Sequence, residues 1–288
     1  DMASAFSTLP MDKTVVVYCY TGQTAGQTTA TLRLLGYDAV SLNGGMGMAA
    51  NAPMGWSNKD YPVVGGMDAK VSAYYEKMPE HIYKINQAEF VQMVVDEKEM
   101  TVLDIRSAKD YAEGHVKGAI NLPWGTAIAE NLEKIPNDKP LYVYCYTGQT
   151  AGQAVATLNI AGFDTRSVNL GWNLGISKVE NVKDVTVMEE TLLADAFTEI
   201  EAPVKEALMA YYEGLKDVAD TKYKNYKVSE LDLKEMVDQK DPSIYILSIR
   251  GAKDYAEGHI EGASNIPFGN DMASAFSTLP MDKTVVVY

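Results

Sequence analysis

The chain has 288 residues, 47% of them hydrophobic, and 25 basic against 39 acidic residues give a formal net charge of −14. This length and composition predict a folded, soluble protein of two ordinary domains, and the acidic balance argues against nucleic acid or anionic membranes as partners. Three scattered histidines argue against a metal site, and two cysteines are too few for a disulfide scaffold. The sequence has no run of 18 apolar residues and no signal-peptide pattern, which argues against a membrane span. We therefore expect no cofactor and one reactive thiol per domain.

An internal repeat organises the chain. Only the middle copy of the repeated unit is continuous, with a front half that ends near a GH(V/I)xGA segment and a back half that opens with a cysteine. The C-terminal front half stops one residue short of the place where its cysteine is due. Three pairs of segments carry the repeat, the first pair identical in sequence: 1–18 with 271–288, 104–125 with 248–269, and 16–27 with 142–153.

The repeat predicts one contiguous domain and one composite domain. The N-terminal back half supplies the cysteine that the C-terminal front half lacks, either in a permuted register or because the sequence is a fragment of a longer array. We expect Asp1 not to be the natural start, so the compartment, export included, stays open. The expected division is a back half at 1–66, a linker at 67–80, the contiguous domain at 81–177, a helical linker at 178–225 and a front half at 226–288.

The first expected element is a central strand at residues 14–18. Its β-branched apolar run, TVVVY, is typical of a buried strand. The 18-residue segment that contains it occurs twice, whereas a composite domain has room for one copy. The spare copy predicts segment-swapped self-association between neighbouring molecules.

Cys19 opens the loop after this strand, and a helical pattern follows the loop. A strand, turn and helix in this order direct backbone N–H groups and a helix N-terminus at the sulfur, which favours the reactive thiolate. The same loop follows the middle domain's strand and opens with Cys145. The expected substrate-binding N–H groups are those of Tyr20, Thr21, Gly22, Gln23, Thr24 and Ala25, and of Tyr146, Thr147, Gly148, Gln149, Thr150 and Ala151.

The contiguous domain alternates expected strands at 101–103 and 141–144 with expected helices at 87–96 and 152–160. This alternation predicts an α/β fold, in which each of the tandem domains holds a parallel β-sheet flanked by helices on both faces. Ligands of such sheets gather at the carboxyl ends of the strands. Both cysteines are expected at that end.

The linker at residues 186–219 has apolar residues at helical spacing, with an interruption at Pro203. It predicts one or two helices whose Met and Tyr side chains pack in a core. Its AYYE sequence at 210–213 recurs at 73–76 in the shorter linker, where the same packing role is expected.

Several motifs, in the right order over most of the two units, resemble those of the rhodanese-like superfamily. The six residues from Cys145 to Thr150 are similar to the family's active-site loop. In the back half, Gly36-Tyr37, Asn43-Gly44-Gly45-Met46 and Tyr61-Pro62-Val63 resemble the segment that closes the domain. The front-half signature is matched by Asp104-Ile105-Arg106, Tyr111, Glu113-Gly114-His115-Val116-Lys117-Gly118-Ala119, Asn121 and Pro123.

The resemblance implies a sulfurtransferase that moves a sulfane sulfur from thiosulfate or a persulfide to a thiol or cyanide through a persulfide on Cys19 and Cys145. Neither loop contains Arg or Lys, residues with which many family members attract thiosulfate. We therefore expect thiosulfate to be a poor donor and a low-molecular-weight or protein persulfide to be the physiological one. The second copy has Ser248 where the first has Asp104, so the two sites are not expected to be equivalent.

Three other functions compete with this interpretation. Related phosphatases carry a Cys-x5-Arg loop, in which the sixth residue after the cysteine is an arginine. In this chain the sixth residue is Ala151 after Cys145 and Ala25 after Cys19. A non-catalytic persulfide carrier or sulfur-sensing binding module would keep the loop without rapid turnover, and a redox enzyme would need an external thiol. Turnover with a sulfane donor and cyanide separates the enzyme from the carrier.

The remaining charged and titratable residues of the motifs have structural interpretations. Arg106 and Arg250 are expected to form ion pairs with the downstream Glu113 and Glu257. The histidines of the same segments, His115 and His259, are interpreted as turn or packing residues. A disulfide between the cysteines is disfavoured because each thiol has a loop of its own.

Overall fold

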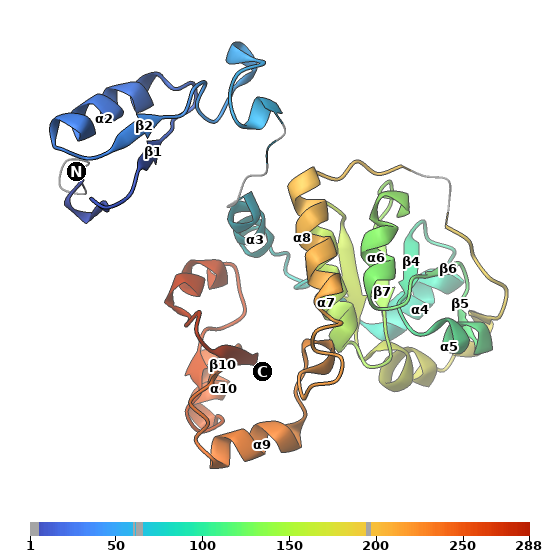
Figure 1. The fold of residues 1–288 in the computed structure, drawn as a ribbon. Helices are drawn as coiled ribbons and strands as arrows, with labels where there is room; N and C mark the ends of the chain where they lie inside the picture. Colours follow the sequence, from blue (N-terminus) through green and yellow to red (C-terminus); the bar gives the residue numbers. More distant parts are fainter. Residues whose placement is uncertain (1–5, 60, 62–65, 194–196) are drawn as a thin grey trace. The chain divides into compact units, whose positions relative to one another are not determined.

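The computed structural model describes residues 6–59, 61, 66–193 and 197–288, and the chain divides into two compact units, Asp1–Gly65 and Gly66–Tyr288 (Figure 1). The larger unit contains the whole contiguous domain and the C-terminal front half. No helix within the described ranges is long and apolar enough to cross a membrane.

The contiguous domain is built on a five-stranded sheet with the order β3-β8-β7-β4-β6, and all its pairings are parallel (Figure 1). Strand β7, which leads to Cys145, is central and pairs with β4 on one side and β8 on the other. The strands are β3 (Lys84–Ile85), β4 (Thr101–Asp104), β6 (Ala119–Asn121), β7 (Leu141–Tyr144) and β8 (Thr165–Val168).

Helices cover both faces of this sheet because side chains alternate along its strands. On β7, Leu141 and Val143 belong to a core formed with α6, α7 and α8, whereas Tyr142 and Tyr144 belong to a second core formed with α4 and α5. The predicted parallel sheet with helices on both faces is confirmed. The helices are α4 (Gln87–Val95), α5 (Ala108–Glu113), α6 (Thr126–Glu130), α7 (Gln149–Ile160) and α8 (Ala202–Glu213).

Among its described residues, the segment after the contiguous domain contains one α-helix, α8, instead of a continuous helical stretch. Its first part forms the short strand β9 (Thr186–Val187), which pairs antiparallel with β5 (His115–Val116). Pro203 is the second residue of α8, where the missing N–H breaks no intrahelical bond, so it begins the helix instead of interrupting it. Tyr212 of α8 is fully buried and lies 5.4 Å from Trp124, ring centroid to centroid, as expected for core packing.

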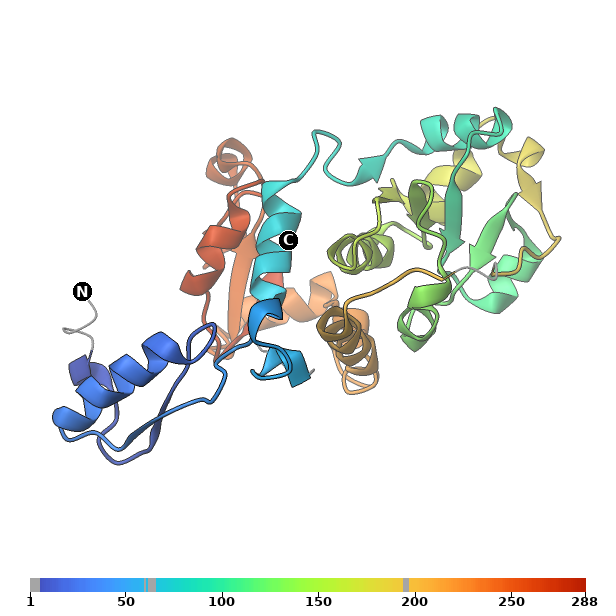
Figure 2. The same cartoon turned by 90° about the horizontal axis from the view of Figure 1, so that it is seen from above.

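The C-terminal half has a three-stranded parallel sheet with the order β11-β10-β12. Its core joins residues of α9, β10 and β12, with Met236, Ile246 and Val286 buried. The helix α3 (Gly66–Glu76) packs against η9 of this half (Figure 2). The elements here are η8 (Lys224–Tyr226), α9 (Glu230–Asp238), β10 (Ile244–Ser248), α10 (Ala252–Glu257), β11 (Ser264–Asn265), η9 (Met272–Thr278) and β12 (Thr284–Val287).

Residues 6–59 of the N-terminal unit contain two parallel strands and one long helix. β1 and β2 pair along their whole length, and α2 follows the Cys19 loop. The two copies of the 18-residue segment thus have different partners, because β1 pairs with β2 and β12 pairs with β10. The elements are η1 (Phe6–Thr8), β1 (Val15–Val17), α2 (Gln23–Leu34), β2 (Ala39–Ser41), η2 (Ala49–Asn51) and η3 (Ser57–Lys59).

Candidate active site: the two cysteine loops

Cys145 lies directly after β7, and its side chain is buried, with 2% of the residue exposed. The sulfur accepts hydrogen bonds from the backbone N–H of Gly148 at 3.1 Å and of Ala151 at 3.4 Å. Gly148 has φ 99° and caps α7, which begins at the next residue, so the positive end of the helix dipole faces the sulfur. Sequence and structure therefore agree on a helix N-terminus at this thiol.

The Cys19 loop repeats this geometry. The N–H of Gly22 lies 3.1 Å and that of Ala25 3.4 Å from the Cys19 sulfur. The hydrogen bond from the Thr24 side chain, followed by that from the Ala25 amide, lowers the pKa of this thiol from 9.0 to about 7. Both cysteines are free thiols.

The pKa of Cys19 leads to a prediction about its reactivity. Alkylation by iodoacetamide should have its midpoint near pH 7 instead of pH 9, because the thiolate already predominates just above pH 7. The rate at Cys19 can be followed by peptide mass mapping between pH 5 and 10. Thr24→Val removes the hydrogen bond that lowers the Cys19 pKa most, so it should move the midpoint to higher pH. A wild-type midpoint near pH 9 would contradict the lowered pKa.

At least two of the six predicted N–H groups in each loop contact the sulfur, and in the Cys19 loop the Thr21 backbone contributes as well. In the middle domain these are Gly148 and Ala151, while Gln149 and Thr150 form the first turn of α7. Tyr146 instead accepts a hydrogen bond at its carbonyl from the N–H of Asn173. The loop is thus held by a second segment as well as by its own helix.

That second segment is the turn at Gly171, which lies against the back of the Cys145 loop. The N–H of Trp172 donates to the Cys145 carbonyl at 2.8 Å. Gly171 has φ 58°, and a Cβ added there would lie 2.5 Å from the Cys145 oxygen. Only glycine fits this position. Gly45 makes the same approach to the Cys19 carbonyl in the N-terminal unit.

Gly171→Ala should therefore displace the Cys145 loop and destabilise the middle domain by roughly 2–4 kcal/mol, through overpacking and strain at positive φ. Gly152→Ala is the matched control, since Gly152 lies inside α7 with nothing within 4 Å of its added Cβ. Alanine there should be neutral or stabilising by up to about 1 kcal/mol. Urea unfolding of the two variants measures the difference, and equal midpoints would show that the Gly171 contact does not matter.

A polar group at the rim of the Cys145 loop joins Tyr146 to two residues that the sequence interpretation did not select, Ser107 and Asp110. The Tyr146 hydroxyl donates to the Asp110 carboxylate and accepts from the N–H of Ser107 at 3.0 Å. Hydrogen bonds from Ser107 and then Tyr146 lower the pKa of Asp110, so this rim carries a negative charge. The Ser-x-x-Asp spacing at the start of α5 is a helix-capping signal that could have identified Ser107 and Asp110 in advance.

Behind the loop lies a buried ion pair whose partner was predicted wrongly. Arg106, 3% exposed, pairs with the fully buried Asp104 at 2.6 Å and not with Glu113. The guanidinium also lies over the Trp172 ring, 4.3 Å from its centroid. Glu113 is exposed and pairs with Lys109.

The second copy lacks this pair. Ser248 replaces the aspartate, and its buried hydroxyl has no hydrogen-bond partner. Arg250 is exposed and donates to the Gly258 carbonyl at 2.7 Å, while Glu257 pairs with Lys253 instead of the predicted Arg250.

The two histidines of the signature have structural surroundings. His115 is fully buried, stacks on Tyr111 at 3.6 Å between ring centroids, and contacts the Tyr111 carbonyl at 2.8 Å. His259 repeats the stacking on Tyr255 at 3.9 Å. Among the described residues, neither imidazole ring forms a hydrogen bond with a cysteine sulfur. The hydrogen bonds to the two sulfurs come from backbone N–H groups of their own loops.

Comparisons with known proteins agree with the motifs. The chain is 35% identical over 80 residues to the thiosulfate sulfurtransferase GlpE of Shewanella oneidensis, which covers 28% of this chain and 75% of that protein. It is 29% identical over 89 residues to a protein named sulfurtransferase from Allochromatium vinosum, covering 31% and 81%. It is 28% identical over 82 residues to the putative sulfur carrier protein YrkF of Bacillus subtilis, covering 28% and 44%, so the chain spans less than half of that relative.

A solved structure of thiosulfate sulfurtransferase from Pseudomonas aeruginosa aligns with 95% of this chain and 50% of its own, at 18% identity and a TM-score of 0.33. The family described as Rhodanese-like domain matches residues 1–48, 86–177 and 229–288, which is more than half of the chain. The matched segments contain both cysteine loops and nearly all of both front halves. The chain therefore belongs to the rhodanese-like domain family.

Proposed function

We propose that this protein is a sulfurtransferase that carries a sulfane sulfur as a persulfide on Cys145 and on Cys19. The supporting observation is the placement of each sulfur at a helix N-terminus, with two backbone N–H groups 3.1 and 3.4 Å away. These donors stabilise a thiolate and, after transfer, the terminal sulfur of a persulfide. Sulfur transfer to a thiolate needs no general base, because a thiolate has no proton to lose before it attacks.

The reaction consists of two displacements at sulfur. The Cys145 thiolate attacks the sulfane sulfur of the donor, a Cys145–sulfur bond forms, and the donor's S–S bond breaks with its electron pair leaving on sulfite or on a thiolate. An acceptor thiolate or cyanide then attacks the terminal sulfur, and the Cys145 thiolate leaves. No net oxidation occurs, and the enzyme thiolate is regenerated.

The charges near Cys145 favour a thiol persulfide over thiosulfate as the donor. The loop from Cys145 to Ala151 holds no cation, and the negatively charged Asp110 accepts a hydrogen bond from Tyr146, the residue that follows Cys145. A dianion such as thiosulfate is repelled by this carboxylate. The S–S group of an ionised thiol persulfide carries one negative charge, whereas thiosulfate carries two, so this carboxylate repels the persulfide less.

Intact mass after incubation with thiosulfate, and separately with glutathione persulfide, tests the proposal. We expect a gain of about 32 Da per active cysteine that dithiothreitol reverses. The fraction of protein that gains this mass should be larger with the persulfide donor. Peptide mapping assigns the added sulfur to Cys19 or Cys145. No gain with either donor on folded protein would contradict persulfide chemistry.

A persulfide carrier is the second candidate, and the absence of cations from both loops favours it. A carrier forms the persulfide but transfers it slowly to small acceptors. Continuous thiocyanate formation with cyanide in excess supports the enzyme, whereas a single stoichiometric burst supports the carrier.

A further inference from the structure

Leu170 begins the turn that holds the Cys145 loop, and its backbone adopts a conformation that favours glycine. Its φ is 62° and its ψ is 1°, in the left-handed region. A residue with a Cβ atom is strained there, and such residues cluster at functional sites. In the N-terminal unit, the same position of the repeat is occupied by Gly44, with φ 74°. The middle domain therefore has a leucine where the backbone prefers glycine.

The two turns make the same backbone contact with their cysteine loops. The N–H of Trp172 donates to the Cys145 carbonyl at 2.8 Å, and the N–H of Met46 donates to the Cys19 carbonyl at 2.6 Å. A turn that begins with glycine thus makes the contact that holds a cysteine loop. Because this contact does not require a leucine, the side chain of Leu170 needs another explanation.

Burial does not supply that explanation. Leu170 is 50% exposed, whereas Leu103 and Leu141 in the core of the same domain are fully buried. A half-exposed leucine gains only part of the free energy that burial of the whole side chain provides, and the strain at positive φ opposes this gain. A strained and exposed apolar side chain beside an active-site loop therefore indicates contact with a ligand.

Leu170 lies beside the part of the loop that contacts the sulfur. A Cβ added to Gly148 would lie 3.3 Å from the Leu170 nitrogen, and the N–H of Gly148 donates to the Cys145 sulfur at 3.1 Å. Two further apolar side chains of the loop and the turn are exposed, Tyr146 at 37% and Leu174 at 57%. We call Tyr146, Leu170 and Leu174 the apolar rim of the Cys145 site.

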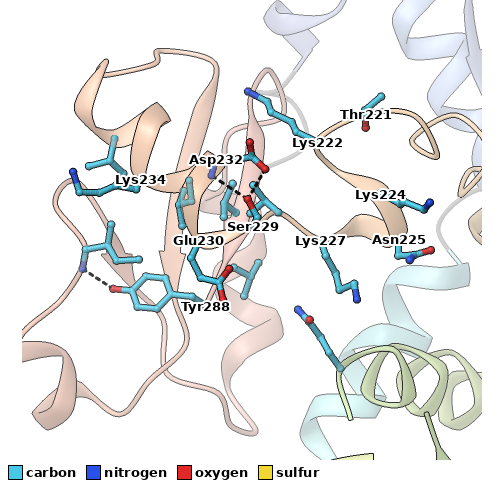
Figure 3. Close-up of a pocket in the computed structure, with 17 residues that line it drawn as sticks. Thr221, Lys222, Lys224, Asn225, Lys227, Ser229, Glu230, Asp232, Lys234 and Tyr288 are labelled. Carbon is cyan, nitrogen blue, oxygen red and sulfur yellow. Dashed lines mark hydrogen bonds between the residues drawn. The ribbon is translucent and has the colours of Figure 1, made fainter. Parts of the chain in front are cut away.

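A pocket beside α7 is the other candidate for binding a donor near this loop. It is lined by Gln149 at the start of α7 and, on the segment before α9, by Lys222, Lys224 and Lys227 (Figure 3). Among the described residues that line it, there is neither Cys145 nor a member of the apolar rim. A molecule in this pocket would contact α7 and the lysines instead of the rim, so the pocket provides a control for the role of the rim.

We propose that the apolar rim selects the donor of Cys145, with Leu170 in contact with a hydrocarbon group on the inner sulfur of a thiol persulfide. This inference rests on the proposed function and names the donor class, a persulfide with an apolar substituent. The contact favours such a donor because it removes apolar surface from water. The Cys145 thiolate attacks the terminal sulfur of the donor, the S–S bond breaks, and the apolar thiolate leaves with the electron pair. Any proton on the transferred sulfur stays with it.

Two donors of equal charge, butyl persulfide and 2-hydroxyethyl persulfide, test the proposal. Peptide mass mapping follows sulfur addition at Cys145 and gives a second-order rate constant for each donor. The ratio of the two constants is compared between variants, so the intrinsic reactivities of the donors cancel. Leu170→Gly introduces the residue found at position 44 and keeps a backbone-compatible residue. We expect it to lower the ratio of butyl to hydroxyethyl persulfide by roughly 10-fold, the usual effect of losing an apolar contact.

Two control variants should keep the wild-type ratio within about twofold. Leu170→Met retains an apolar side chain of similar volume at the rim. Lys227→Gln removes a charge from the pocket beside α7 and leaves the rim intact. The unfolding midpoint of Leu170→Gly should stay close to that of the wild type, because Leu170 is half exposed and glycine suits its φ.

An unchanged ratio in Leu170→Gly would overturn the proposal, and so would an equal loss in Leu170→Met. A tenfold fall in Lys227→Gln would assign the donor to the pocket beside α7 and also overturn it. If wild-type Cys145 gains sulfur from neither donor, the persulfide chemistry itself is contradicted, and the role of the rim falls with it. Failure of the proposed function is thus distinguished from failure of the rim alone.

Discussion

Cys145→Ser, in a chain that already carries Cys19→Ser, is expected to reduce sulfur transfer by at least about 1,000-fold. A hydroxyl in place of the thiolate keeps the loop, the two N–H donors and the α7 N-terminus, and removes only the nucleophilic sulfur. Thiocyanate formation from a persulfide donor and cyanide measures the loss.

The single variants are the controls for this result. Cys19→Ser should retain the activity of the middle domain, and Cys145→Ser should retain whatever the Cys19 loop contributes. Unfolding midpoints should stay close to wild type, because serine is similar in size to cysteine. A double variant that still turns over would place the chemistry outside both loops and exclude the proposed mechanism.

Asp104→Ser is expected to destabilise the middle domain by about 3–5 kcal/mol. The substitution leaves the Arg106 guanidinium, 3% exposed, without the carboxylate that accepts its hydrogen bonds at 2.6 and 3.0 Å. It also reproduces the residue that stands at Ser248 in the second copy, where Arg250 is exposed. The midpoint of urea unfolding measures the effect.

Two further variants show whether the unpaired buried charge causes the loss. Asp104→Asn combined with Arg106→Met removes both charges and should recover most of the stability, since no unpaired charge then remains buried. Glu97→Gln breaks the exposed pair with Lys117 and should change stability by less than about 1 kcal/mol. An Asp104→Ser effect no larger than that of Glu97→Gln would mean that Arg106 reaches solvent.

Local chemistry explains which parts of the site could be predicted. The loop after Cys145 contains Gly148 at the one position that requires positive φ, and an apolar strand precedes it, so the helix N-terminus at the sulfur followed from neighbouring residues alone. The partner of Arg106 did not, because Asp104 and Glu113 are both close in sequence and only the direction of α5 places Glu113 in solvent. The approach of Gly171 to the Cys145 carbonyl joins residues 26 positions apart.

The repeat, the family, the α/β class and the two cysteine loops could be identified without the structure, because they depend on residue identity and on periodicity along the chain. Tertiary structure decided which strands pair. The identical segments form β1 and β12 with different neighbours, although no local property distinguishes them. Strand pairing depends on what lies across the sheet, and identical residues therefore take different partners when the elements available to them differ.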